Sequence, residues 1–187
     1  MFSRFEADAV TRIAGRRAVA SLDFRASKTA VTDQDLRSFR VLHLATHGVL
    51  NTEHPELSGL VFSLVDQGGR AVDGFLRLHE VYNLDLHADL VVLSACRTAL
   101  GREVRGEGLV GLTRGFLYAG ARRVISTTWN VDDRASSVLM SRFYESMLTK
   151  GMKATEALRD AQLSMLRDPR WADPRFWGAF TIQGDWR

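Results

Sequence analysis

The chain has 187 residues, of which 45% are hydrophobic and 25% are charged. This length suits a single domain with a sizeable core, and the composition excludes disordered, collagen-like and disulfide-rich proteins. The 25 basic and 22 acidic residues give a net charge of +3 and are interspersed along the sequence, so no basic stripe favours binding to nucleic acid.

The chain contains one cysteine, Cys96, so it cannot form an internal disulfide. A single free thiol fits a reducing compartment. Residues 1–17 include Glu6 and Asp8 and lack the apolar core of a signal peptide. No segment approaches the roughly 18 apolar residues that span a membrane. We therefore expect a cytoplasmic protein without a membrane span.

In the first half of the chain, the hydrophobic pattern predicts short helices and apolar strands. An amphipathic helix over residues 3–14 would place Phe5, Ala9, Val10 and Ile13 on one face. The further predicted elements are a short strand at 18–23, a helix that starts from a capping box of Thr32 and Asp35 and runs through Leu36, strands at 40–48 and 57–65, a turn at 67–69 and a short helix at 75–84.

In the second half, a predicted strand at 88–96 is apolar on both sides, which is typical of a central parallel strand. A glycine-rich loop, a helix at 109–119, a strand at 122–129, a long helix from Asp132 or Asp133 through Leu148, a helix at 153–167 and a strand at 177–185 follow. Strands that alternate with helices of this length predict an α/β fold, in which helices cover both faces of a mainly parallel sheet.

Two reactive side chains lie at the carboxyl ends of predicted strands. His47 comes near the end of the strand at 40–48, and Cys96 ends the strand at 88–96. Reactive groups in parallel α/β folds gather beyond the carboxyl ends of the strands. If these two strands are neighbours, the imidazole and the thiol emerge on the same rim of the sheet.

A thiol with its ordinary pKa of about 8.5 is only slightly ionised at neutral pH. An imidazole within hydrogen-bond reach can therefore act as the base that generates the thiolate. The amides of Gly48 and Cys96 would form an oxyanion hole, because glycine lets a bound carbonyl approach closely. The structural alternative is that Cys96 is a small buried hydrophobe and His47 a hydrogen-bonded residue. The residues alone leave both interpretations open.

Several segments carry a resemblance to a known family. In this order, VLHLATHG, LVVLSACRTALG, GEGLVGLTRGFLYAGARRVISTTWNVDD, RFYESML and ATEALRDAQLSML resemble the CHAT domain. The resemblance extends over nearly the whole chain. CHAT domains are caspase-like cysteine peptidases that are related to separases and caspases and often attached to tetratricopeptide repeats. Caspases have Gln and Gly where this chain has Ser94 and Thr98, and these two residues fit the CHAT branch.

The resemblance implies a caspase-like three-layer sandwich and a catalytic dyad. In this dyad, His47 is the general base and acid, Cys96 is the nucleophile, and no third carboxylate is required. Family members begin with a strand before the first helix, which this chain lacks. We therefore expect one peptidase domain over residues 1–187, either cut from a longer protein with an attached repeat domain or shortened.

Acidic residues near the end of the strand at 122–129 have two possible roles. Asp132 and Asp133 would cap the long helix that follows. Similarity to separases implies that the matching segment holds a basic side chain before the scissile bond, and Asp133 aligns best with the acid of that segment. Glu103 and Glu107 are further candidates for such a substrate pocket. Capping and substrate binding both remain open for Asp132 and Asp133.

A zinc site could be drawn from His43, His47, His54 and Cys96. However, two histidines four residues apart on a strand are separated by about 13 Å, which is too far for shared ligation. We therefore expect no metal and no cofactor.

These observations together predict a cysteine endopeptidase that acts on protein or peptide substrates through His47 and Cys96. An attached tetratricopeptide-repeat module or another partner module would regulate it, and neither nucleic acid nor membrane is an expected partner. One alternative is an interaction domain of the same fold that does not use its dyad. A third interpretation is a thiol hydrolase or acyltransferase that acts on small substrates.

Overall fold

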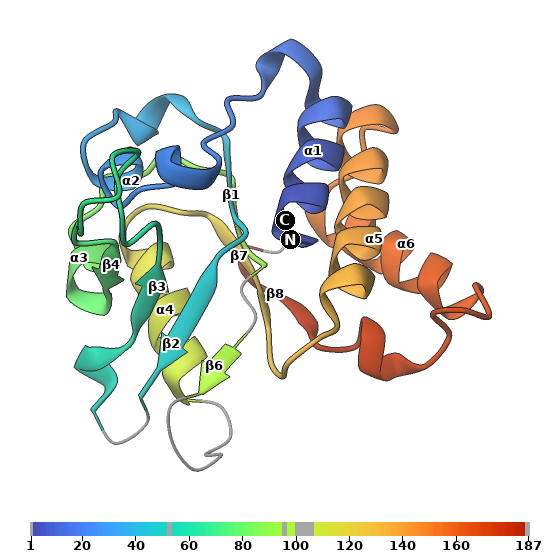
Figure 1. Ribbon diagram of the computed structural model, residues 1–187. Coiled ribbons are helices and arrows are strands. Elements are labelled where there is room, and N and C mark those ends of the chain that lie inside the picture. Colours follow the sequence, from blue (N-terminus) through green and yellow to red (C-terminus); the bar gives the residue numbers. More distant parts are fainter. Residues whose placement is uncertain (1, 52–53, 95–96, 100–106, 186–187) are drawn as a thin grey trace. The chain divides into compact units, whose positions relative to one another are not determined.

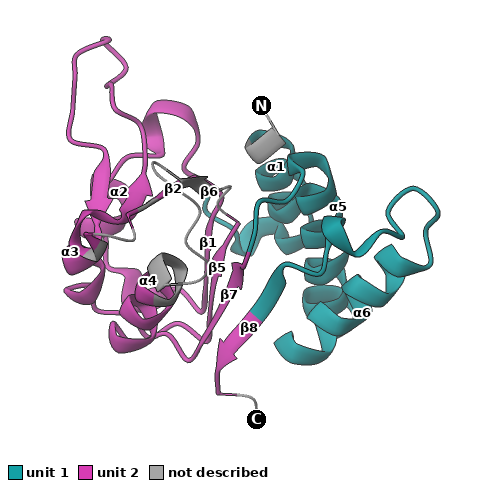
Figure 2. Cartoon of the chain, turned by 90° about the horizontal axis from the view of Figure 1, so that it is seen from below, with its two compact units in different colours: residues 1–20, 129–181 teal, residues 21–128, 182–187 magenta. Residues whose placement is uncertain are grey.

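The chain folds into helices and short strands (Figure 1). The computed structural model describes residues 2–51, 54–94, 97–99 and 107–185. The chain divides into two units (Figure 2): unit 1 consists of residues 1–20 and 129–181, and unit 2 of residues 21–128 and 182–187. Unit 1 is therefore built from two segments that are separated in sequence by most of unit 2.

The first sheet, sheet A, is mainly parallel. Its strand order is β1-β5-β7-β8, with β1 at Val41–Leu44, β5 at Leu90–Leu93, β7 at Arg123–Thr127 and β8 at Phe180–Gly184. β5 pairs in parallel with both β1 and β7, and all four of its residues are buried. A strand in this position needs an uninterrupted apolar sequence. The sequence LVVL meets that need, so the predicted central parallel strand is confirmed.

The second sheet, sheet B, belongs to unit 2. Its strand order is β4-β3-β2-β6, with β2 at His47–Leu50, β3 at Gly59–Val61, β4 at Phe75–Arg77 and β6 at Arg97–Ala99. β2 pairs in parallel with β6, whereas the pairs β2–β3 and β3–β4 are antiparallel. The predicted single strand at 40–48 is therefore wrong, because β1 and β2 are separate strands in different sheets.

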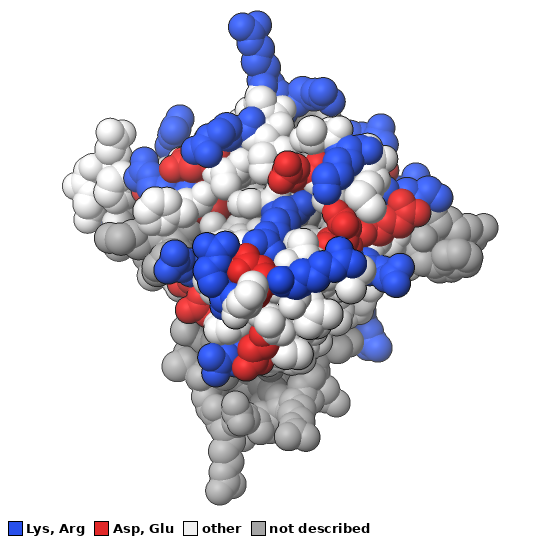
Figure 3. All heavy atoms as spheres, turned by 90° about the vertical axis from the view of Figure 1, so that its right-hand side faces the viewer, with Lys and Arg blue, Asp and Glu red and all other residues white. Residues whose placement is uncertain are grey.

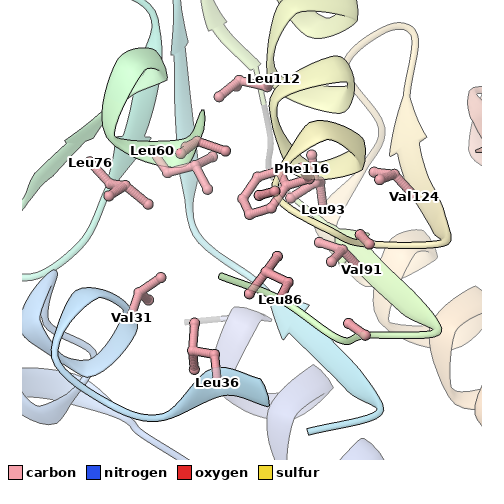
Figure 4. Packing of buried hydrophobic residues seen from close by; sticks show 14 residues of the cluster. Val31, Leu36, Leu60, Leu76, Leu86, Val91, Leu93, Leu112, Phe116 and Val124 are labelled. Atoms are coloured by element: carbon pink, nitrogen blue, oxygen red, sulfur yellow. The ribbon is translucent and has the colours of Figure 1, made fainter. Parts of the chain in front are cut away.

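The core of unit 2 lies between the strands and two helices, α3 (Leu78–Tyr82) and α4 (Glu107–Tyr118). Its buried side chains include Leu60 and Leu76 of sheet B, Val91 and Leu93 of sheet A, and Phe116 of α4 (Figure 4). α3 and α4 approach closely at Gly115, where a Cβ atom would lie 3.1 Å from Val81 Cγ1. The predicted helix at 109–119 is confirmed, and Gly115 permits its close contact with α3.

Unit 1 is helical. α1 (Phe2–Ala14) and α6 (Ala154–Leu166) both pack against α5 (Asp133–Tyr144), which continues as a π-helix at Glu145–Thr149. Buried residues of α5 and α6 form the interior of this unit: Leu139, Met140, Phe143, Tyr144, Ala157, Ala161 and Met165. The predicted helices at 3–14, from Asp132 or Asp133 through Leu148, and at 153–167 are confirmed within one or two residues.

The predicted apolar face of α1 is partly wrong. Phe5 is 59% exposed, whereas Glu6 is only 3% exposed. Burial and the nearby Glu6 carboxylate raise the pKa of Tyr144, so that the phenol stays protonated. The packing of α1 on α5 sets the rotation of the helix, and a helical period alone does not fix this rotation to within one residue.

Four shorter elements also differ from the sequence predictions. Residues 18–22 form no strand, because a 3₁₀ helix at Gly15–Arg17 precedes them and Asp23 adopts a φ of 53° after them. Asp35 caps a separate 3₁₀ helix, Leu36–Ser38, by accepting a hydrogen bond from the amide of Arg37. The predicted helix at 75–84 is divided between β4 and α3, and the predicted strand at 57–65 is limited to Gly59–Val61.

The remaining described helices are α2 (Thr29–Thr32) and 3₁₀ helices at Asp23–Arg25, Pro55–Leu57 and Pro174–Phe176. No helix in the described part of the chain is long and apolar enough to cross a membrane. On the face drawn in Figure 3, basic and acidic side chains are interspersed. The fold is mixed α/β with a mostly parallel sheet, and the caspase-like three-layer sandwich stays a prediction.

Candidate active site

Two parallel strand pairs of unit 2 share one register. In sheet A, Val41 lies opposite Leu90 and Leu44 opposite Leu93. In sheet B, Gly48 lies opposite Arg97. In each pair the residue numbers differ by 49, which is also the sequence separation of His47 and Cys96. The two neighbouring segments of the chain therefore pass from sheet A to sheet B with the same offset of 49 residues.

His47 is the first residue of β2 and is exposed. It was expected at the carboxyl end of a strand. Instead it lies just beyond the carboxyl end of β1, after the link formed by Ala45 and Thr46. Val61 of β3 is its antiparallel partner. The next residue, Gly48, is buried between β3 and β6, where it lies opposite Leu60 and Arg97.

The link between β1 and β2 is tied to sheet B by a side chain. Thr46 Oγ1 donates a hydrogen bond to the carbonyl oxygen of Val61. Thr46 is half-buried. The Thr46 hydroxyl therefore links the residue that precedes His47 to Val61, the residue that lies opposite His47 in the sheet.

The chain that leaves β2 is held by a buried serine. Ser58 Oγ accepts a hydrogen bond from the amide of Asn51 at 3.0 Å, and it lies 3.3 Å from the Asn51 carbonyl oxygen, to which it donates. Asn51 Oδ1 accepts from the amide of His54 at 2.8 Å. Because these bonds involve backbone groups, they fix the path of the chain on the far side of His47.

The carboxyl end of β5 has an unusual polar group. The amide of Ser94 donates to the carbonyl oxygen of Leu44 at 3.2 Å, which continues the parallel pairing of β1 and β5 by one residue. The Ser94 hydroxyl oxygen is buried and has no hydrogen-bond partner in the described part of the chain. Cys96 and Glu103, which the sequence predicts as nucleophile and substrate-binding acid, lie outside the described residues, and so does the Cys96 amide of the predicted oxyanion hole.

The two aspartates of the predicted substrate pocket belong to unit 1, whereas His47 and Gly48 belong to unit 2. Asp132 Oδ1 accepts a hydrogen bond from the amide of Ala135 at 2.9 Å and is the N-cap of α5. Asp133 is exposed in the first turn of that helix. The capping role is therefore confirmed for Asp132. The side chain of Glu107, in the first turn of α4, lies outside the described part of the molecule.

No group of three or more His, Cys, Asp or Glu side chains with the arrangement of a metal site occurs among the residues described. His43 lies within β1 and is half-buried. His54 is exposed and its Nδ1 lies 3.3 Å from Glu56 Oε1.

The family model of the CHAT domain matches residues 2–185, which is nearly the whole chain. The chain belongs to the CHAT domain family.

Two relatives of this CHAT domain are much longer tetratricopeptide-repeat proteins. Tetratricopeptide repeat protein 28 of Mus musculus is 39% identical over 105 residues, which are 56% of this chain and 4% of that protein. Tetratricopeptide repeat protein 28 of Homo sapiens is 31% identical over 147 residues, which are 79% of this chain and 5% of that protein. The CHAT domain thus corresponds to a small part of these relatives.

Sequence reasoning predicted roles for His47 and Gly48 of the CHAT domain but gave Thr46 no role. The only signal was its place between two apolar segments, directly before His47. A threonine there fits the interior of a single strand as well as a link between two sheets. Its bond to Val61 depends on a tertiary neighbour fifteen residues away, which no local pattern reveals.

Proposed function

We propose that this CHAT domain is a cysteine endopeptidase, with Cys96 as the nucleophile and His47 as the general base and acid. The shared register of the two parallel strand pairs carries the proposal. His47 is bonded to Gly48 and Cys96 is bonded to Arg97, and Gly48 and Arg97 are register partners. Neighbouring strands lie about 4.8 Å apart, and this spacing supports the proposal that the His47 imidazole reaches the Cys96 thiol.

In the proposed reaction, the His47 imidazole removes the proton of the Cys96 thiol. The thiolate attacks the carbonyl carbon of a peptide bond and forms a tetrahedral intermediate. The protonated imidazole gives its proton to the leaving amine as the C–N bond breaks, which leaves an acyl-enzyme. The same imidazole then takes a proton from water, and the hydroxide oxygen replaces the sulfur on the acyl carbon.

The proposed oxyanion hole consists of the amides of Gly48 and Cys96. It would stabilise the negative charge that develops on the carbonyl oxygen in the transition state. Gly48 is proposed for this role because it follows His47 directly and carries no side chain to obstruct a substrate. The proposed reaction needs only groups of the protein.

The proposal also covers substrate and partner. Asp132, Asp133 and Glu103 are proposed to favour peptides with a basic side chain before the scissile bond, since carboxylates bind such side chains as ion pairs. Both relatives are named as tetratricopeptide repeat proteins. This supports a tetratricopeptide-repeat module as the partner that regulates the domain.

Alkylation of the thiol tests the dyad directly. Cys96 is the only cysteine, so its reaction with iodoacetamide can be measured without interference. Because an imidazole stabilises the thiolate, the midpoint of the pH–rate profile should lie well below the ordinary value of about 8.5. His47→Ala should return the midpoint to about 8.5 and lower the rate at pH 6.5 by about tenfold or more. His79→Ala, an exposed histidine of α3, serves as the matched control.

A profile that is the same in the wild type and in His47→Ala would refute the dyad. It would instead favour the interaction domain of the same fold that does not use its dyad. Peptidase activity itself is measured by cleavage of a peptide library. Cys96→Ala and Cys96→Ser should abolish cleavage without lowering the melting temperature, and cleavage by either variant would refute Cys96 as the nucleophile.

A further inference from the structure

The segment between β1 and β2 changes its strand partners over two residues. β1 ends at Leu44 in sheet A, and β2 begins at His47 in sheet B. The backbone must therefore turn from one sheet to the other immediately before His47. Whatever fixes Ala45 and Thr46 also fixes the direction in which the His47 side chain leaves the backbone, because successive side chains of a strand point to opposite faces.

The Thr46 hydroxyl is the group placed to fix this turn. It donates to the carbonyl oxygen of Val61, and Val61 is the register partner of His47. The bond runs from the residue before His47 to the strand that flanks His47. On the far side, the Ser58 hydroxyl holds Asn51 just after β2 ends. Side-chain hydroxyls thus secure the chain both before and after this strand.

We propose that Thr46 is a positioning residue for His47. Its hydroxyl holds the amino-terminal end of β2 against β3, so that the imidazole meets the Cys96 thiol in the geometry that proton transfer needs. Thr46 contacts neither the thiol nor the substrate in this proposal. The proposal rests on the proposed cysteine peptidase function, in which misplacement of a catalytic group by about 1 Å can lower the rate about a hundredfold.

The experiment compares variants that keep or remove the hydroxyl. Thr46→Val removes the donor and keeps the branched shape that suits a strand, whereas Thr46→Ser keeps the donor. The pH–rate profile of Cys96 alkylation by iodoacetamide is measured for both, together with the melting temperature. We expect Thr46→Val to shift the midpoint of the profile toward 8.5 and to lower the rate at pH 6.5 by about tenfold. Thr46→Ser should retain the wild-type profile.

Thr113→Val is the matched control for stability. Thr113 is buried in α4, and its Oγ1 lies 3.4 Å from Ser126 Oγ of β7. This substitution also removes one hydroxyl group from a hydrogen-bonded pair. It should lower the melting temperature by a similar amount but leave the alkylation profile unchanged. Thr46→Ala is a second hydroxyl-free variant, without the extra methyl group of valine beside the Val61 carbonyl.

The outcomes separate this proposal from the proposed function. If His47→Ala shifts the profile while the hydroxyl-free Thr46 variants do not, the dyad stands and the positioning role is wrong. If none of these variants shifts the profile, the proposed dyad itself is wrong. If the Thr46→Ser profile shifts as far as the Thr46→Val profile, the hydroxyl is not the group that matters, and the positioning role is again wrong.

Discussion

At the scale of single residues, the described contacts show no stabilising role for the hydroxyl of Ser94. It is buried and has no hydrogen-bond partner there. A buried hydroxyl without a hydrogen-bond partner lowers the free energy of unfolding by about 1–3 kcal/mol relative to an apolar group. We therefore expect Ser94→Ala to leave the free energy of unfolding unchanged or to raise it by about 1 kcal/mol.

The matched control for this prediction is Ser58→Ala. Ser58 is also buried, but its hydroxyl bonds to both backbone groups of Asn51. Its removal should lower the free energy of unfolding by about 1–3 kcal/mol. Urea unfolding of the two variants measures the contrast. A loss of more than about 1 kcal/mol in Ser94→Ala would show that its hydroxyl has a stabilising partner.

Single residues of the site were predictable from sequence when a local rule applied to them. His47 and Gly48 were predicted because a histidine followed by a glycine near the end of an apolar segment fits a known chemistry, and their catalytic roles stay a prediction. Thr46 was given no role and Ser94 was noted only for its difference from caspases, because the hydrogen bonding of each hydroxyl depends on the segments packed around it. Tertiary neighbours decide whether a hydroxyl is bonded, and a single sequence does not contain them.

At the scale of elements, the start of α5 separates two roles that the sequence left open. Asp132 caps this helix. Asp132→Ala should lower the free energy of unfolding by about 1 kcal/mol, whereas Asp132→Asn should retain most of the stability because asparagine caps equally well. If the Asp132 charge also binds substrate, Asp132→Asn should lose the preference for basic peptides while the fold stays intact.

Unfolding in urea and cleavage of paired basic and neutral peptides measure these two effects. Equal destabilisation by Asp132→Ala and Asp132→Asn would contradict the capping role, because the amide supplies an equivalent acceptor. An unchanged peptide preference in Asp132→Asn would limit Asp132 to capping and leave the specificity role to Asp133 or Glu103.

Elements with a strong period or an unbroken apolar run were predicted well. α5 and α6 have helical periods, and β5 is apolar without interruption. The division of residues 40–48 into β1 and β2 was missed, because Ala45 and Thr46 contain no glycine or proline to mark it. The change of sheet depends on which strands are available as partners, and that is a property of the whole unit.

At the scale of the whole molecule, the division into two units was not visible in the sequence. Unit 1 combines residues 1–20 with residues 129–181. None of the three boundaries, at 20/21, 128/129 and 181/182, has the proline- or glycine-rich composition that marks a linker. The three α-helices of unit 1 were each predicted, but their assembly was not, because contacts between α1 and α5 join residues more than a hundred positions apart.

Both units contain ion pairs that should make the molecule sensitive to acid. In unit 2, Asp73 Oδ2 accepts from Lys28 Nζ at 2.8 Å, and this bond together with the amide of Phe75 lowers the pKa of Asp73 to about 2. In unit 1, hydrogen bonds from Arg170 and then Arg142 lower the pKa of Asp168. Asp160 also has a lowered pKa, because Ser146 and Lys150 donate to it.

A carboxylate with a lowered pKa in the folded state stabilises the fold when it is ionised. Its contribution is complete above the unfolded pKa of about 3.9 and is lost as the pH falls through the folded pKa. The free energy of unfolding should therefore decrease between about pH 4 and pH 2. Asp73→Asn should be less stable than the wild type at pH 5, and the difference should shrink as the pH approaches 2.

Urea unfolding of wild type and Asp73→Asn at pH 5, 4, 3 and about 2 measures this linkage, and Asp168→Asn repeats the test in unit 1. Because the asparagine side chain does not titrate, the stability difference at each pH reports the ionisation of the one replaced carboxyl group. A difference that stays constant from pH 5 to about 2 would mean that the carboxyl titrates alike in the folded and unfolded chains. In that case the ion pair of Asp73 with Lys28 would not contribute to the stability of unit 2.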